Sequence, residues 1–113
     1  MRVDIKAKNI KLTSTIKDYI WGKMDMLEKY LGDIQVIHAD FEVELTTSHH
    51  QKGNIFRAEV NLDLAGKLLR VEKTEKDLYK AIDKVKDHLA RSIRRYKQKR
   101  IDRKKKGSET DKF

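Results

Sequence analysis

Strict alternation of apolar and polar residues recurs along the chain and predicts four β-strands. In the first, Val3, Ile5 and Ala7 alternate with charged residues. A period of two sends successive side chains to opposite faces of a strand, so each segment has one apolar and one charged face. The segments with this pattern are residues 2–8, 37–45, 56–64 and, after a tight turn, 68–73.

Two longer segments carry apolar residues at spacings of three and four, which is typical of amphipathic helices. The first helix is expected to begin after an N-cap at Thr13 and to end at Leu31, with Gly32 as the residue that follows it. The second follows a predicted capping box at residues 74–77. Because no Gly or Pro interrupts it before Gly107, we expect about 32 residues and roughly 48 Å of helix, too long for its own domain to cover.

The order strand–helix–three strands–helix predicts an α+β fold, a two-layer β-α-β-β-β-α sandwich. Both helices are expected to cover the apolar face of a four-stranded sheet, with the strands at 2–8 and 37–45 parallel neighbours. The opposite face of the sheet is charged. We expect a single domain over residues 1–106, with a basic helix extension at 91–106 and a disordered tail at 107–113.

The positive charge is concentrated near the C-terminus. The 113 residues include 27 Lys or Arg and 18 Asp or Glu, a net charge of +9, and residues 91–106 alone hold ten basic residues and one acidic residue. A localised block of this kind is typical of proteins that bind a polyanion such as RNA. A solvated helix end remains the alternative.

Several function classes are disfavoured. The chain has no Cys, no apolar run long enough to span a membrane and no signal peptide, so we expect a cytoplasmic protein. Neighbouring acids such as Asp40 and Glu42 lie on an open face without a cleft, so we expect no enzyme and no small-molecule substrate. The histidines, including His49 and His50, lack metal-ligand spacing, so we expect no metal or cofactor.

The second helix supplies the strongest candidates for RNA binding. Its outward side is expected to form a continuous basic ridge, whose members are Lys80, Lys84, Arg91 and Arg95. Its apolar stripe ends at Ile93 or Tyr96 and continues as Arg100 and Arg103. Tyr79 and Tyr96 either pack against the core or stack on bases, and Trp21 either covers the sheet edge or meets a partner.

Three segments resemble the ribosome hibernation-promoting factor family, which includes the ribosome-associated inhibitor protein Y and is also labelled as sigma-54 modulation protein. The resemblance covers roughly residues 2–100. Its residues are Thr13, Ile16, Tyr19 and Ile20, then Lys23 and Leu27-Glu28-Lys29-Tyr30, then Asp77-Leu78-Tyr79 with Ala81-Ile82-Asp83, and last Leu89-Ala90-Arg91 with Arg94-Arg95-Tyr96-Lys97.

This resemblance implies a translation inhibitor of stressed or stationary-phase cells, bound to the small ribosomal subunit and its rRNA in the path of mRNA and tRNA. Met26 and Gly22 depart from the usual pattern of the first helix. The resemblance also implies a short form without a dedicated dimerisation domain. The RNA-binding residues expected from the basic pattern and the resemblance together are Lys23, Lys29, Lys80, Lys84, Arg91, Arg94, Arg95, Lys97, Lys99 and Arg100.

Two other functions stay open. The last five elements are similar in order to a general double-stranded RNA-binding module, which would need only an RNA duplex. A regulator of a sigma factor, which would need no RNA, is the third. The additional first strand and the segment around Tyr79 favour the ribosome.

Overall fold

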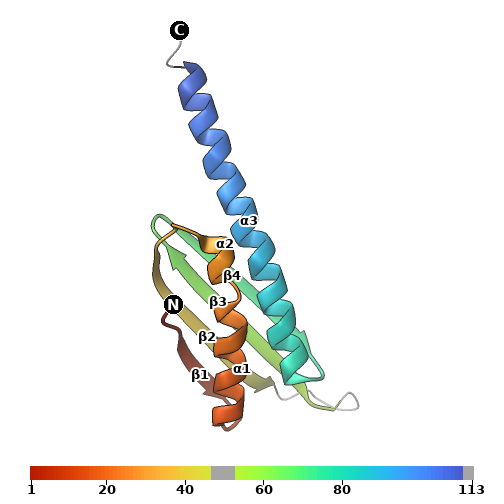
Figure 1. Cartoon of the computed structure of the whole chain (residues 1–113). Coiled ribbons are helices and arrows are strands. Elements are labelled where there is room, and N and C mark those ends of the chain that lie inside the picture. Colours follow the sequence, from red (N-terminus) through yellow and green to blue (C-terminus); the bar gives the residue numbers. More distant parts are fainter. Residues whose placement is uncertain (47–52, 111–113) are drawn as a thin grey trace.

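A computed structural model describes residues 1–46 and 53–110 and has the predicted α+β architecture: one four-stranded sheet with the helices on one face (Figure 1). His49 and His50, which were expected to bind no metal, lie outside the described residues. The strands are β1 (Asp4–Lys8), β2 (Val36–Thr46), β3 (Ile55–Leu64) and β4 (Lys67–Glu75), and the helices are α1 (Ser14–Asp25), α2 (Glu28–Leu31) and α3 (Leu78–Thr110).

The strands lie in the order β1-β2-β3-β4, and β1 pairs with β2 in parallel, as predicted. The other two pairs are antiparallel. A turn at Gly66 (φ 83°) connects β3 to β4, and glycine adopts this left-handed conformation without a Cβ clash. The parallel pair requires the connection through α1 and α2 to cross one face of the sheet, and α3 returns over the same face (Figure 1).

The first predicted helix is broken into two, which corrects the expectation of one continuous helix to Leu31. Its N-cap is confirmed, because the Thr13 hydroxyl accepts a hydrogen bond of 3.2 Å from the Ile16 backbone N–H. The break falls at Met26 and Leu27, where the Leu27 N–H bonds to the Met24 carbonyl in a tighter turn. This turn keeps Leu27 fully buried, so the apolar stripe is preserved although the helix is not.

The start of α3 also differs from the prediction. Thr74 is still part of β4, and Asp77 caps the helix instead. The Asp77 carboxylate accepts hydrogen bonds from the backbone N–H groups of Tyr79 (2.8 Å) and Lys80 (3.2 Å). At its other end α3 continues through Gly107 to Thr110, into the segment expected to be a disordered tail, because one glycine weakens a helix by only about 1 kcal/mol. Residues 111–113 lie outside the described chain.

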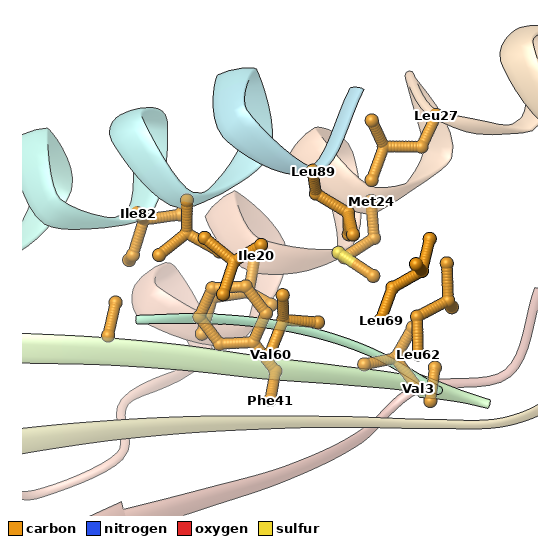
Figure 2. Close-up of a cluster of buried hydrophobic side chains, with 14 of the residues drawn as sticks. Val3, Ile20, Met24, Leu27, Phe41, Val60, Leu62, Leu69, Ile82 and Leu89 are labelled. Carbon is orange, nitrogen blue, oxygen red and sulfur yellow. The ribbon is translucent and has the colours of Figure 1, made fainter. Parts of the chain in front are cut away.

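The core lies between the sheet and the three helices. Phe41, Val60 and Leu62 point from the sheet into the same layer as Ile20 and Met24 of α1 and Ile82 and Leu89 of α3 (Figure 2). Each of these side chains is at most 1% exposed. The alternation of β2 fails at Ile37, which was expected to face the core: a register shift between Val36 and His38 leaves Ile37 56% exposed.

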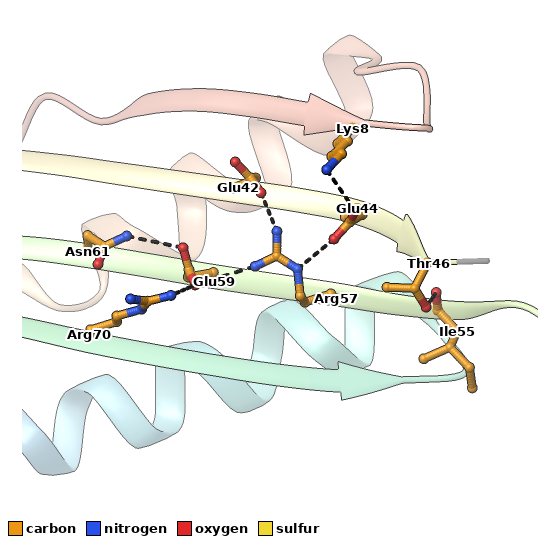
Figure 3. A network of polar contacts seen from close by, with 9 residues as sticks. All are labelled: Lys8, Glu42, Glu44, Thr46, Ile55, Arg57, Glu59, Asn61 and Arg70. Carbon is orange, nitrogen blue, oxygen red and sulfur yellow. Dashed lines mark hydrogen bonds and ion pairs between the residues drawn. The ribbon is translucent and has the colours of Figure 1, made fainter. Parts of the chain in front are cut away.

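The opposite face of the sheet is a layer of paired charges centred on Arg57 (Figure 3). The Arg57 guanidinium bonds to Glu44 (2.7 Å), to Glu42 and, at 3.4 Å, to Glu59, which also accepts a hydrogen bond of 2.8 Å from Arg70. The hydrogen bond from Arg57 lowers the pKa of Glu44. Burial opposes the ionisation of Glu59, but the bond and charge of Arg70 outweigh it and lower its pKa as well. This face therefore neutralises itself.

Candidate nucleic-acid interface

Helix α3 projects well past the end of the sheet (Figure 1). Its last buried residue is Ile93, and from Arg94 to Lys104 every described side chain except Tyr96 and Lys97 is exposed. The radius of gyration is 17.1 Å, against about 13 Å for a compact domain of this size. The predicted basic extension is thus a helical segment that continues beyond the core of the domain. None of the helices described in residues 1–46 and 53–110 is long and apolar enough to cross a membrane.

The seam between α1 and α3 contains one of the predicted RNA-binding residues, Lys23. Its ammonium lies 3.1 Å from the Asp83 carboxylate and 5.2 Å from the centre of the Tyr19 ring. The Tyr19 hydroxyl donates a hydrogen bond of 2.6 Å to Asp83, and its ring meets that of Tyr79 edge to face at 4.8 Å. The bond to Asp83, reinforced by burial, raises the pKa of Tyr19 to about 12.

A second group of cations gathers around Tyr30 of α2, and we call it the Tyr30 cluster: Tyr30, Lys29, Arg94 and Lys97. Lys29 and Arg94 lie over the Tyr30 ring at 5.1 and 5.3 Å from its centre. Lys97 reaches across from α3, so that a Cβ placed on Gly32 would lie 3.8 Å from its Nζ. Three residues predicted separately from the sequence are therefore brought together by the packing of α2 against α3.

The predicted ridge on the outward side of α3 is not a continuous row of free cations. Lys80 and Arg91 are exposed. Lys84 forms an ion pair of 2.9 Å with Glu75 of β4, which the sequence reasoning did not pair with it. Arg95 also lines a groove between the projecting part of α3 and the β3–β4 turn.

This groove lies beneath the projecting part of α3, facing the turn between β3 and β4, and we call it the α3 groove. It has a volume of about 710 Å³. Its floor includes Gly66 and Leu69, while Tyr96 lies where α3 leaves the core. Its cationic lining comes from Lys67, Arg95, Lys99, Arg100 and Arg103. The sequence did contain a signal for it, because Arg100 and Arg103 continue the line of the core stripe.

The exposed part of α1 adds an apolar element. Trp21 is 44% exposed and Met26 51% exposed, so Trp21 is available to a partner rather than covered by the sheet edge. Nothing lies within 4 Å of a Cβ placed on Gly22, which leaves this stretch of α1 open. Tyr79 and Tyr96, by contrast, are half-buried against the core.

Three side chains at the edge of the charged sheet face could together hold a divalent cation. His38 lies 3.0 Å from Asp40 and 3.5 Å from Asp4, and their ligand atoms are all within 4.8 Å of one another. The sequence reasoning compared the histidines with each other and so missed this grouping, which the parallel register of β1 and β2 creates. His88 lies apart, between α3 and the sheet, and burial lowers its pKa.

Comparisons with known proteins point to one family. The family described as "Sigma 54 modulation protein / S30EA ribosomal protein" matches residues 3–101. A "Ribosome hibernation promotion factor" of Lactococcus lactis subsp. cremoris (strain MG1363) is 33% identical over 104 residues, and one of Staphylococcus aureus (strain COL) is 34% identical over 104 residues. Each alignment covers 92% of this chain, but the chain spans only about half (53% and 52%) of these relatives.

Solved structures agree with this assignment. The Protein Y N-terminal domain of Thermus thermophilus has a TM-score of 0.72 at 32% identity, and the alignment covers 85% of this chain and 99% of that domain. A ribosomal subunit interface protein of Coxiella burnetii (TM-score 0.64, 16% identity, 87% and 99% coverage) shares the fold. The descriptions of the family and of the two hibernation promotion factors are not those of enzymes, in agreement with the expectation of a non-catalytic protein. The chain belongs to the Sigma 54 modulation protein / S30EA ribosomal protein family.

Proposed function

We propose that this chain binds the small ribosomal subunit through its rRNA, occupies the decoding channel and blocks mRNA and tRNA by steric exclusion. The observation that carries the proposal is the projecting end of α3, where cations lie beyond the core and next to those of the Tyr30 cluster. Names that refer to ribosome hibernation among the relatives support the ribosome as partner. A ribosomal partner implies a cytoplasmic location.

The distribution of charge favours the helical side as the contact surface. On the sheet, Lys8, Arg57 and Arg70 balance the charges of Glu42, Glu44 and Glu59, so that face offers little attraction to phosphate. Around Tyr30, Lys29 and Arg94 lie over one aromatic ring and Lys97 lies nearby at Gly32, and none of the three has an acidic partner among the described residues. Arg94 can bind a phosphate with two parallel hydrogen bonds, and Lys29 and Lys97 add mobile positive charges.

The other expected residues extend this surface along α3. Arg91 and Lys80 lie on its outward side, and Arg95, Lys99 and Arg100 follow its projecting part. Lys23 and Lys84 each hold an acidic partner, so they contribute less unless that partner moves away. We therefore assign the largest contribution to Lys29, Arg94 and Lys97.

The shape of the protein supports a steric mechanism. Its principal extents are 64 × 28 × 18 Å, so one elongated body would fill a length of channel that several nucleotides of mRNA otherwise occupy. Exclusion needs no turnover. Inhibition should therefore saturate at about one protein per ribosome, in contrast to an enzyme that inactivates many.

A general double-stranded RNA-binding module is the second candidate, favoured only by the basic charge and the order of the elements. The two candidates differ in what they need for binding: an assembled subunit or any duplex. Regulation of a sigma factor would need neither.

Competition on the ribosome tests the proposal. The protein is added to vacant small subunits, or to subunits preloaded with mRNA and initiator tRNA, and each mixture is sedimented through sucrose. We expect co-sedimentation only with vacant subunits, and we expect free RNA duplex at the same concentration to leave the protein at the top. Protein and tRNA together on one subunit would refute the steric mechanism, and equal binding to duplex would favour the general module.

A further inference from the structure

The α3 groove is a concave site with a strongly basic lining. Its volume of about 710 Å³ falls in the range of small-molecule sites, roughly 300–1,000 Å³, and is too small for a nucleic acid duplex. It opens under α3 towards the β3–β4 turn, on a different side of the helix from the Tyr30 cluster. Adjacent residues of a helix point about 100° apart, and Arg94 belongs to the cluster while Arg95 lines the groove.

The groove contains five cations. Within the described part of the chain, none of them is ion-paired, although Lys84 and Lys86, which also belong to α3, are. Placing several positive side chains around one cavity costs electrostatic energy that a bound anion would remove. The five are Lys67, Arg95, Lys99, Arg100 and Arg103.

Their spacing fits more than one phosphate group. Arg95, Lys99 and Arg103 follow one another at intervals of four residues, so their Cα atoms rise about 6 Å per step along the groove. A single inorganic phosphate would meet at most part of this row. A ligand with two or more phosphates can use all of it.

The groove also contains a surface on which a base can stack. The Arg100 guanidinium lies 5.8 Å from the centre of the Tyr96 ring, and both side chains line the groove. Tyr96 is half-buried against the core, which fixes its ring and gives Arg100 a defined place. Nucleobases stack on guanidinium planes as they do on aromatic rings.

We propose that the α3 groove binds one nucleotide with at least two phosphate groups, the base stacked on Arg100 and the phosphates on Arg95, Lys99 and Arg103. This chemistry has two sources: a free nucleoside diphosphate, or an unpaired nucleotide within an RNA strand together with its flanking phosphates. The proposal does not require the ribosome as the partner, because small probes can fill the groove.

Titration calorimetry of the whole chain with small probes tests the groove. The probes are ADP, pyrophosphate and adenosine, with a single-stranded adenine trinucleotide for the RNA source. We expect ADP or the trinucleotide to bind at least tenfold more tightly than pyrophosphate or adenosine, because only they combine base and phosphates. Stronger binding of ADP indicates the free nucleotide, and stronger binding of the trinucleotide indicates the strand.

Two matched substitutions separate stacking from charge. Arg100→Lys keeps the charge but removes the planar group, so it should weaken binding of the preferred probe about tenfold and leave pyrophosphate binding within twofold. Arg2→Lys makes the same change outside the groove and should alter neither. Both positions are exposed, so both variants should fold as the parent does.

Three outcomes would overturn the proposal: no saturable binding of ADP or the trinucleotide, pyrophosphate binding as tight as that of ADP, or equal losses in the two variants. The last two would show a diffuse attraction to anions. Each of these outcomes leaves the ribosomal proposal standing, since that proposal is tested by sedimentation of the subunit and assigns its largest contribution to the Tyr30 cluster.

Discussion

Tyr19 and Asp83 are 64 residues apart in the sequence and share a hydrogen bond of 2.6 Å that joins α1 to α3. The same Asp83 oxygen is 3.1 Å from the Lys23 ammonium. One carboxylate thus fixes the distance between two helices and also neutralises a cation on the side that we assign to RNA.

The titration of Tyr19 should reveal this bond. Its pKa is raised from 10.0 to about 12 because ionisation would remove the proton that the hydroxyl donates to Asp83, and because burial and the Asp83 charge also oppose the anion. A group whose pKa is higher in the folded state stabilises the fold fully below its unfolded pKa, so this contribution should decline as the pH rises from about 10 to 12. Tyrosinate absorbance should show one late-ionising tyrosine that moves toward pH 10 in Asp83→Asn.

Removing the hydroxyl should also lower stability. We expect Tyr19→Phe to reduce the free energy of unfolding by about 1 kcal/mol, measured with urea at pH 7. Tyr30→Phe is the matched control, because within the described residues its hydroxyl donates no hydrogen bond. Equal losses in both variants would mean that the Tyr19–Asp83 bond adds nothing to stability.

Binding to ribosomes should depend strongly on salt. If about six phosphates are contacted, affinity should fall by about three orders of magnitude between 50 and 200 mM salt. Changing Lys29, Arg94 and Lys97 to Ala together should reduce the slope of log K against log salt by about 2–3. The matched triple change of Lys6, Lys11 and Lys76, which are exposed cations outside the Tyr30 cluster and the α3 groove, should reduce it less.

Removing Arg57 should destabilise the sheet, because its three carboxylate partners would lose their positive counter-charge. The Arg57 side chain is 14% exposed, and Arg57→Gln leaves Glu42, Glu44 and Glu59 facing one another, so we expect a loss of about 2 kcal/mol at pH 7. Because Arg57 lowers the pKa of Glu44 from its ordinary value of 4.5, this stabilisation is fully present above pH 4.5. It is lost as the pH falls below that value.

Urea unfolding at pH 7 and below pH 4.5 measures both effects. The gap between the parent protein and Arg57→Gln should shrink at the lower pH, since protonated carboxyls no longer repel. Arg2→Gln, at a position 93% exposed, should show almost no loss at either pH. A gap that widens in acid would contradict the assigned direction.

The cap of α3 gives a direct comparison of prediction and structure. Asp77→Ala should reduce the free energy of unfolding by about 1 kcal/mol, because two backbone N–H groups lose their acceptor. Thr74→Ala, at the position where the sequence pattern predicted the cap, should cost less than half as much. A larger loss at Thr74 would restore the predicted capping box.

Much of the fold could be predicted from the sequence because its periodic patterns are long and consistent. The alternation in β2 and β3 and the stripes of the helices placed nearly every buried side chain. The exceptions are local. The break at Leu27 and the exposure of Ile37 depend on a tight turn and a register shift, and neither changes the average period that the pattern reports.

The candidate site was predicted as a set of basic residues but not as an arrangement. Arg94 and Arg95 are adjacent in one helix, so their side chains must point in different directions. Only the packing of α2 and of the β3–β4 turn decides what each one faces. The pairs Lys23–Asp83 and Lys84–Glu75 depend in the same way on how neighbouring elements align, so a count of charges in one helix could not find them.

Beyond Ile93, Tyr96 is the one described residue of α3 that still packs against the core, so the directions of the later side chains are set by the stripe that ends there. Rotational phase is therefore a functional property of this helix. A single residue inserted between Ile93 and Arg94 would turn every later side chain by about 100° and move cations from the Tyr30 cluster and the groove to other sides. Inserting a whole turn would lengthen the projection and nearly restore each direction.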